Sequence, residues 1–327
     1  METNVPGFVG PLAYAKFAGG QSNPTYRIDA ASGRYVLRRK PYGPLLPSAH
    51  AVDREYRLIA GLYPTGFPVA RPYGLCTDDS VLGAMFYVMD FADGRNLWDG
   101  TLPDYAPADR TAIYHAMCDT LADLHNTDYA AAGLGDYGKP GNYFERQVAR
   151  WTKQYRASET EHMPEVEHLI EWLPATLPEQ TRTSIVHGDY RIDNMIFAPD
   201  APRVIAVLDW ELSTLGDPLA DFSYFLMNWV TAPEGRSGVQ GRTGPQTGIP
   251  TIEDMVARYC ARTGRDGVPD LDWYFAYNLF RLTGIVQGVK KRIVDGTASS
   301  AQAEATAARV YGLAEAAWDF AKRAGAE

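Results

Sequence analysis

The chain has 327 residues, of which 46% are hydrophobic and 22% charged, a composition typical of a globular protein with a substantial core. This length suits two domains or one domain with two lobes. The net charge of −9 argues against nucleic acid or an anionic membrane as the main partner. Widely separated cysteines, no basic leader and no apolar run of about 18 residues predict a cytoplasmic protein without a disulfide framework or a membrane span.

The N-terminal region predicts a β-hairpin that follows a glycine-containing loop. Two β-prone segments, residues 25–28 and 35–37, flank a turn at residues 31–33. Glycines in the preceding loop, FAGGQSN, would let backbone amides approach a phosphate, and polar side chains would add contacts. The candidate phosphate-binding residues are Gly19, Gly20, Ser22 and Asn23. A glycine pair before a strand is usually only a turn, so this interpretation depends on residues further along the chain.

A buried ion pair is expected between the second strand of this hairpin and the helix that follows. The strand ends near Arg38, and residues 48–62 predict a helix with Ser48 as its N-cap. Helical spacing places Glu55 beside apolar neighbours, where a carboxylate needs a cation. We expect Glu55 to pair with Arg38. The alternative is an exposed Glu55 that pairs with an arginine of its own helix.

Two further strand candidates, residues 69–76 and 82–89, lead into a connector that contains Asp90 and Ala92. After this connector the composition becomes helical, with apolar residues recurring at helical spacing. Helices are predicted over residues 113–126, 143–158, 164–173, 273–292 and 301–323. The chain therefore predicts a small β-rich part followed by a larger helical part.

A polar, proline-containing loop separates two β-prone runs in the middle of the chain. The first run ends at His187, and the second covers residues 204–208. Together they predict a hairpin whose open end carries acidic and amide side chains. These side chains are Asp189, Asn194 and Asp209.

The spacing of these three side chains suits phosphoryl transfer. Such a transfer needs one carboxylate near the acceptor hydroxyl, and hard oxygen ligands that hold Mg²⁺ against the phosphates. Asp189 suits the first role, and Asn194 and Asp209 suit the second. Each residue alone would more often be an ordinary turn residue. The ordered set, with a strand before each half, favours the functional interpretation.

The motif HGDYRIDN, followed by LDW, resembles the catalytic and metal-binding motifs of the aminoglycoside phosphotransferase and choline kinase family. This resemblance implies an α+β, two-lobed, protein-kinase-like fold. Residues 1–91 would form a small β-rich N-terminal lobe that binds the nucleotide, and residues 92–327 a mainly α-helical C-terminal lobe that binds the acceptor. The implied cofactors are ATP, or GTP in its place, and Mg²⁺.

The same resemblance implies roles for individual residues. Asp189 would be the catalytic carboxylate, Asn194 and Asp209 would bind Mg²⁺, and His187 would support the loop. Backbone groups at the connector, from Asp90 and Ala92, would hold the adenine ring.

A basic residue on the hairpin strand would contact the ATP phosphates. Arg38 stands where most kinases have a lysine, and Lys40 on the same face is its rival. Glu55 would orient Arg38, as the equivalent helix glutamate does in kinases.

The segments GGQSNPTY and VLRRKP resemble the subgroup associated with acyl-CoA dehydrogenases. That resemblance implies a hydroxyacyl compound or another hydroxylated metabolite as the acceptor, so the expected partners are a nucleotide and a small hydroxyl-bearing substrate. One alternative is an aminoglycoside O-phosphotransferase, although the C-terminal region has no obvious acidic cluster. Another is a nucleotide-binding pseudoenzyme that acts through partners, against which the intact acidic set argues. The oligomeric state is left open.

Three features of the C-terminal half have roles outside this motif set. Asp217 and Pro218 predict the start of a helix, with Asp221 given a structural role in its first turn. Residues 231–250 predict a long loop, either a mobile lid or a surface excursion. Arg281, in a largely apolar helix, would either meet an anionic substrate or be satisfied by a buried carboxylate.

Overall fold

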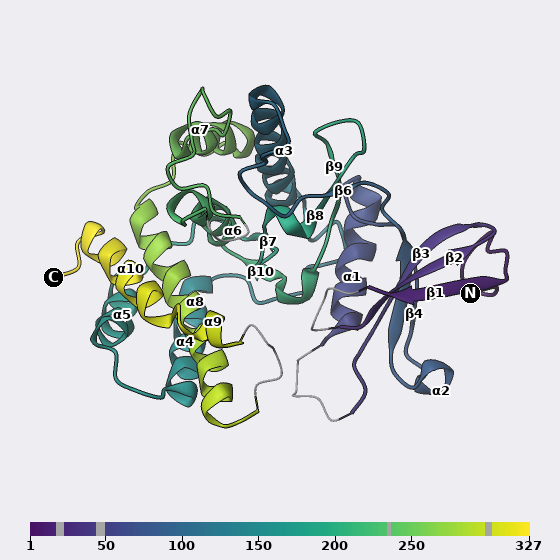
Figure 1. Ribbon diagram of the computed structural model, residues 1–327, viewed down its shortest axis with the longest axis horizontal. Coiled ribbons are helices and arrows are strands. Elements are labelled where there is room, and N and C mark those ends of the chain that lie inside the picture. The colour runs from purple at the N-terminus through teal and green to yellow at the C-terminus, as the bar shows by residue number, and fades with distance from the viewer. Residues whose placement is uncertain (18–22, 44–49, 234–236, 298–302) are drawn as a thin grey trace.

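The computed structural model describes residues 1–17, 23–43, 50–233, 237–297 and 303–327. Figure 1 shows a sheet-rich region that carries the N-terminus beside a larger, mainly helical region that carries the C-terminus. The expected α+β architecture, with a small β-rich part and a mainly helical part, is confirmed. Among the described residues, no helix combines the length and the apolar character that a membrane span requires.

The N-terminal region is built on a five-stranded antiparallel sheet with the strand order β1-β2-β3-β5-β4. Its strands are β1 (Leu12–Lys16), β2 (Thr25–Ala30), β3 (Gly33–Arg39), β4 (Pro72–Cys76) and β5 (Phe86–Asp90). Helix α1 (Val52–Leu62) packs against β4 and β5 on the side that faces the helical region (Figure 1). Its apolar face, with Leu58 and Leu62, is fully buried, so the helix links the sheet to the rest of the molecule.

The predicted N-terminal hairpin is confirmed as β2 and β3. The predicted helix begins at Val52, whereas Ser48, its expected N-cap, lies outside the described residues. The strand expected over residues 82–89 begins only at Phe86, after the short helix α2 (Asp79–Leu82). Gly83 ends this helix with a φ of 75°, a conformation that glycine adopts without steric cost.

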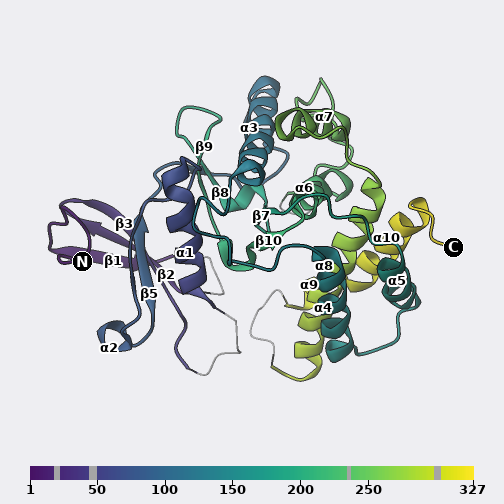
Figure 2. The ribbon, with the colours of Figure 1, turned by 180° about the vertical axis from the view of Figure 1, so that it is seen from behind.

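The helical region is organised around the long helix α8, which packs against α10, α4 and α6 (Figures 1 and 2). Its helices are α3 (Pro107–Asn126), α4 (Tyr143–Ser158), α5 (Pro164–Ala175), α6 (Pro218–Leu226), α7 (Ile252–Thr263), α8 (Leu271–Val294), α9 (Ala303–Ala307) and α10 (Val310–Arg323). Short 3-10 helices are η1 (Tyr63–Thr65), η2 (Ile192–Asn194), η3 (Trp210–Leu212) and η4 (Met227–Val230). All nine residues of α6 are buried, so this helix lies inside the core rather than on its surface.

The central segment forms two small sheets rather than one hairpin. Strand β7 (Ser184–Val186) pairs with β10 (Thr214–Gly216). Strand β9 (Val204–Val207) pairs with β8 (Met195–Phe197), and β8 also pairs with β6 (Arg95–Asn96). The predicted pairing of the run ending at His187 with residues 204–208 was therefore wrong. The short apolar run of β8 lies immediately before the proline-containing loop, and it forms the hairpin instead.

The C-terminal stretch is divided between α9 and α10 rather than forming one helix. Val310, Ala317 and Phe320 are buried as the expected apolar stripe. Ala314 takes the place expected for Leu313, which is only half-buried. The division turns the buried face of α10 toward α8 and α5.

The described part of the loop 231–250 is anchored to the helical region. The Thr111 hydroxyl donates to the Gly248 carbonyl at 2.6 Å, and the Trp229 indole donates to the Pro250 carbonyl at 2.7 Å. Within this part, Val239 and Ile249 are fully buried. The described part of this loop is therefore fixed to the helical region at these points, while Gln240 and Gln246 are exposed.

Candidate active site

Strand β7 leads directly into residues 187–194, which we call the catalytic loop. Its first residue, His187, is fully buried. The His187 Nδ1 accepts a hydrogen bond from the Asp189 N–H at 3.1 Å, and its Nε2 donates to the Leu208 carbonyl at 2.8 Å. These partners fix the tautomer that carries the proton on Nε2. The imidazole ties the loop to the end of β9, in agreement with the expected supporting role.

A buried carboxylate holds the backbone of the catalytic loop. Asp221 of α6 is 1% exposed, and its oxygens accept hydrogen bonds from the N–H groups of His187 at 2.5 Å and Gly188 at 2.7 Å. The His125 Nε2 lies 3.5 Å from the same carboxylate. Burial alone would raise the pKa of Asp221, but the bonds with His125 and the loop backbone hold that pKa below its ordinary value. The structural role expected for Asp221 is thus to hold the backbone of the catalytic loop at His187 and Gly188.

Asp189 is the more exposed of the two carboxylates in this loop. Its side chain is 22% exposed, whereas that of Asp193 is 4% exposed. The Asp189 Oδ1 accepts a hydrogen bond from the Tyr224 hydroxyl at 2.8 Å and lies 3.1 Å from the Arg191 Nε. The Asp189 Oδ2 accepts from the Asn194 Nδ2 at 3.1 Å. The carboxylate therefore has neighbours on both oxygens and a side that faces solvent.

Backbone pairing brings the two expected metal ligands close to each other. The Leu208 N–H donates to the Asn194 carbonyl at 2.8 Å, and Asp209 follows directly. Asp209 has a φ of 62°, a left-handed conformation in which the chain leaves β9 and enters η3. Its side chain is 38% exposed. Because the Asn194 amide nitrogen is bonded to Asp189, its Oδ1 and the Asp209 carboxylate are the oxygen atoms of this pair that could hold a cation.

Arg38 of β3 connects the sheet to this pair. Its Nε lies 2.7 Å from the Glu55 Oε2 on α1, and its Nη2 lies 2.9 Å from the Asp209 Oδ1. Glu55 also accepts hydrogen bonds from the Tyr87 hydroxyl at 3.1 Å and the Asn23 Nδ2 at 2.9 Å. The ion pair expected between Glu55 and Arg38 is present, and the structure extends it to Asp209.

Lys40, the rival of Arg38, points elsewhere. Its Nζ lies 3.7 Å from Asp53 on the surface of α1. Burial alone would lower the pKa of Arg38, but the interactions with Glu55, Tyr87 and Asp209 together outweigh burial and raise it. Burial raises the pKa of Glu55, and the Arg38 charge opposes that shift. Arg38 is therefore the cation that the fold places beside Asp209.

The expected phosphate loop is only partly described. Gly19, Gly20 and Ser22 lie outside the described residues. Asn23 is described, but its side chain is fully buried and bonded to Glu55. Its position supports the Arg38 pair rather than presenting an amide to solvent.

The connector after β5 offers an open backbone donor at Ala92. The Asp90 N–H is bonded to the Arg71 carbonyl at 2.9 Å, and the Asp90 carboxylate accepts from the Tyr73 hydroxyl at 2.5 Å. Within the described part of the chain, the Ala92 N–H has no hydrogen-bond partner. The Ala92 N–H could donate a hydrogen bond to an adenine ring placed here, whereas the Asp90 N–H already donates to the Arg71 carbonyl.

Three residues near Asp189 have contacts that the sequence analysis missed. They are Arg191, Tyr224 and Arg281, whose Nη2 donates to the Gly188 carbonyl at 2.5 Å. Arg281 therefore binds the catalytic loop itself, through a backbone carbonyl rather than the buried carboxylate that was one of its two expected partners. Tyr224 lies three residues after Asp221 in α6, so helical spacing placed both on the face toward the loop. The position of the loop that follows β7 in space was needed to identify that target.

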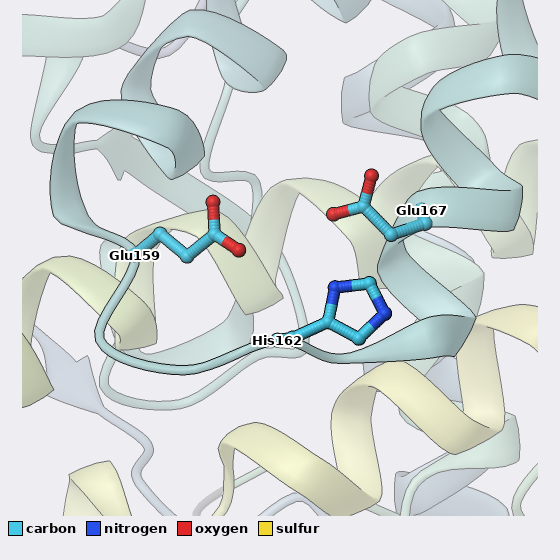
Figure 3. Close-up of side chains that lie close together, drawn as sticks. All are labelled: Glu159, His162 and Glu167. Atoms are coloured by element: carbon cyan, nitrogen blue, oxygen red, sulfur yellow. The ribbon is translucent and has the colours of Figure 1, made fainter.

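A second group of potential ligands lies far from this site in the fold. Figure 3 shows the side chains of Glu159, His162 and Glu167 turned toward one another, and their ligand atoms lie within 4.8 Å of each other. Arg156 pairs with Glu159 at 3.3 Å and with Glu167 at 2.5 Å. The hydrogen bond from Arg156 lowers the pKa of Glu167. Because this guanidinium already pairs with both carboxylates, we assign no metal to the group.

Comparison with known proteins places the chain in a family. Residues 13–259 match the phosphotransferase enzyme family. Acyl-CoA dehydrogenase family member 10 of Mus musculus is 46% identical over 319 residues, which cover 97% of this chain and 30% of that protein. The chain spans between 30% and 42% of the length of the first curated relatives that it matches.

Solved structures share the whole fold. A Ralstonia eutropha protein assigned as an aminoglycoside phosphotransferase is 50% identical, with a TM-score of 0.92 over 99% of this chain and 96% of that one. A thermostable aminoglycoside phosphotransferase in complex with ADP and hygromycin B is 15% identical, with a TM-score of 0.59 over 96% of this chain and 95% of that one. The chain therefore belongs to the phosphotransferase enzyme family and has a protein-kinase-like fold.

Proposed function

We propose that this protein is a Mg²⁺-dependent and ATP-dependent kinase that transfers the γ-phosphoryl group to a hydroxyl of a small molecule. The observation that carries the proposal is a continuous set of contacts between the expected site residues. Asp189 is bonded to Asn194, Asn194 is bonded to the backbone beside Asp209, and Asp209 is paired with Arg38. The nucleotide lobe would comprise residues 1–91 and the acceptor lobe residues 92–327.

The described residues fit the proposed cofactors. The Asn194 amide oxygen and the partly exposed Asp209 carboxylate are hard oxygen donors of the kind that Mg²⁺ prefers. Arg38 offers a guanidinium that suits phosphate oxygens, and Ala92 offers a free N–H for adenine. ATP is favoured because a neighbour of this fold binds ADP, and GTP is the alternative donor.

In this site the protein would contribute positioning and charge more than covalent chemistry. Bound Mg²⁺ would neutralise charge on the phosphates. Asp189 would orient the acceptor hydroxyl and take up its proton as the acceptor oxygen bonds to the γ-phosphorus. The bond from that phosphorus to the β–γ bridging oxygen breaks, and ADP leaves. Arg38 would hold the phosphates, with Glu55 keeping the guanidinium in place.

For the acceptor we favour a hydroxyacyl compound. Support comes from the relatives named as acyl-CoA dehydrogenase family members, which contain a region similar to this chain. The partly exposed cation Arg191 beside Asp189 also suits a substrate with negative charge better than a polycationic antibiotic. The name of the Ralstonia eutropha protein favours an aminoglycoside as the competing acceptor.

The test is ADP formation by the purified protein with ATP or GTP and Mg²⁺. The acceptor panel contains hydroxyacyl-CoA compounds, free hydroxy acids, aminoglycosides, choline-like alcohols and sugars. We expect stimulation by the hydroxyacyl class, with Asp189→Asn lowering turnover at least a hundredfold, since the carboxylate orients the nucleophile. The matched control is Asp200→Asn, an exposed carboxylate in the β8–β9 turn, which should keep full turnover.

Each result separates the candidates. Stimulation by aminoglycosides alone would replace the acceptor class and keep the reaction. Binding of ATP and Mg²⁺ without turnover for any acceptor would favour the pseudoenzyme. Full turnover in Asp189→Asn would contradict the role given to this carboxylate.

A further inference from the structure

Tyr224 donates a hydrogen bond to the catalytic carboxylate from a helix that carries none of the recognised motifs. Its hydroxyl lies 2.8 Å from the Asp189 Oδ1, and its side chain is 9% exposed within α6. Resting on the proposed function, we propose that Tyr224 is a positioning residue that fixes the orientation of the Asp189 carboxylate toward the acceptor hydroxyl. Arg281 fixes Tyr224 and the catalytic loop together.

The contacts around Asp189 restrain both of its oxygens. Asn194 donates to Oδ2, while Tyr224 donates to Oδ1 and the Arg191 Nε lies 3.1 Å from the same atom. Arg191 is 31% exposed on a long side chain, so its contact can exchange with solvent. Tyr224 has a rigid ring with the hydroxyl at its end, and it is the buried one of the two Oδ1 neighbours. Rotation of the carboxylate is therefore limited mainly by Tyr224 and Asn194.

The buried hydroxyl of Tyr224 needs a hydrogen-bond partner, and Asp189 provides it. A phenylalanine would fill the same space, and a buried hydroxyl without a partner is unfavourable. Among the described residues, Asp189 is the hydrogen-bond partner of this hydroxyl. Burial, together with the Asp189 charge, raises the pKa of Tyr224, so the phenol keeps its proton and acts as a donor.

Arg281 links the tyrosine ring to the loop. Its guanidinium lies 5.1 Å from the centre of the Tyr224 ring and 5.6 Å from that of Trp151, a cation between two aromatic faces. Its Nη2 also donates to the Gly188 carbonyl, directly before Asp189. The buried Arg281 side chain thereby restrains both Tyr224, which donates the hydrogen bond, and the backbone next to Asp189, which accepts it.

Such restraint matters because phosphoryl transfer depends on positioning. Misplacement of a catalytic group by about 1 Å costs up to about a hundredfold in rate. Loss of a hydrogen bond to a charged group corresponds to about a tenfold to hundredfold change. We therefore expect Tyr224→Phe to lower kcat at least about tenfold and to leave the KM for ATP within twofold, because Tyr224 does not contact the nucleotide side.

The experiment measures Mg²⁺-dependent ADP release from ATP, with the acceptor that supports turnover or with water where none does. The variants are Tyr224→Phe, Asp189→Asn and the double variant, and urea unfolding is measured for each. Tyr114→Phe is the matched control, because this buried hydroxyl donates to the Gly100 carbonyl at 2.6 Å, away from the catalytic loop. The positioning role requires that Tyr224→Phe cause no further loss of turnover in the Asp189→Asn background, whereas Tyr114→Phe stays within twofold of the wild type.

The outcomes are distinct from those that test the proposed function. If Asp189→Asn loses turnover and Tyr224→Phe keeps it, the positioning role is overturned and the kinase assignment stands. If Tyr224→Phe lowers turnover equally in both backgrounds, or lowers it together with the urea midpoint and a raised KM for ATP, its role is general packing and the inference fails. Full turnover in Asp189→Asn removes the assigned role of Asp189, and Tyr224 then has no catalytic group to position.

Discussion

The two sides of the candidate active site are held together by different kinds of contact. On the proposed nucleotide side, charged side chains pair with one another: Arg38 binds both Glu55 and Asp209. On the proposed acceptor side, charged side chains bind the main chain, since Asp221 and Arg281 hold the N–H and carbonyl groups of the catalytic loop. The first arrangement lies partly open at Asp209, and the second is buried.

This difference implies that the two sets of contacts respond differently when ligands bind. The contact of Arg38 with the partly open Asp209 can exchange when phosphates and a metal ion enter, because both side chains have several rotamers. A loop backbone held by buried groups has no alternative partners. We infer that the nucleotide side adapts to its ligand while the acceptor side is preformed.

Replacement of Asp221 should cause the largest loss of stability and of turnover. In Asp221→Asn the amide oxygen serves one loop N–H, while the amide nitrogen faces the other as a second donor. Loss of this buried, charge-assisted pairing should lower the free energy of unfolding by about 3 kcal/mol. Turnover should fall as well, because the loop carries Asp189. Urea unfolding with parallel ADP-release assays checks both effects. Unchanged stability would show that the loop does not depend on this carboxylate.

Asp217 gives a matched comparison four residues away on the same helix, with the opposite expected sign. Burial raises the pKa of Asp217 from 3.8 to about 6, and its carboxylate accepts a single backbone hydrogen bond, from Leu219. The folded state therefore favours the protonated form, and this contribution to stability is complete below the unfolded pKa and is lost as the pH rises through about 6.

Asp217→Asn keeps an N-cap side chain and removes the charge. A shift of two pKa units corresponds to about 3 kcal/mol at most, so at pH 7.5 the variant should be more stable than the wild type by up to this amount. The difference should vanish near pH 4. Unfolding by urea at both pH values measures it. A variant that is less stable at pH 7.5 would mean that the ionised carboxylate is favoured at this helix end.

The nucleotide side should show a smaller effect. Glu55→Gln keeps the size of the side chain but removes the charge that Arg38 meets. Because Arg38 retains Asp209, we expect the KM for ATP to rise about tenfold, with kcat reduced less and the fold intact. Steady-state kinetics with varied ATP test this, and Asp53→Asn, an exposed carboxylate on the same helix, is the control. Equal effects of the two variants would indicate a general charge effect of α1.

The architecture and much of the ion-pair geometry were predictable from local patterns. Alternation and turn residues identified the β2–β3 hairpin, and an inward glutamate beside a basic strand end identified the pair of Glu55 with Arg38. These features depend on neighbours in sequence or on one strong electrostatic requirement. The helix that starts at Pro218, with Asp217 as its N-cap, was predicted for the same reason.

The pairing of short strands and the targets of buried polar residues were not predictable in this way. Three-residue strands such as β7 and β8 are too short for periodicity to decide their partners, so the central hairpin was assigned to the wrong run. Arg281 illustrates the second limit. A buried guanidinium needs acceptors, but periodicity does not say that one of them is a backbone carbonyl in a loop 93 residues away.

The two amide hydrogens bound by Asp221 belong to a segment without regular secondary structure, yet they are as enclosed as those of a core helix. The carboxylate that accepts these bonds lies on α6, every residue of which is buried. We therefore expect these two amide hydrogens to exchange slowly with solvent, whereas loops are ordinarily among the first parts of a chain to open. Hydrogen exchange at His187 and Gly188 would measure this protection directly.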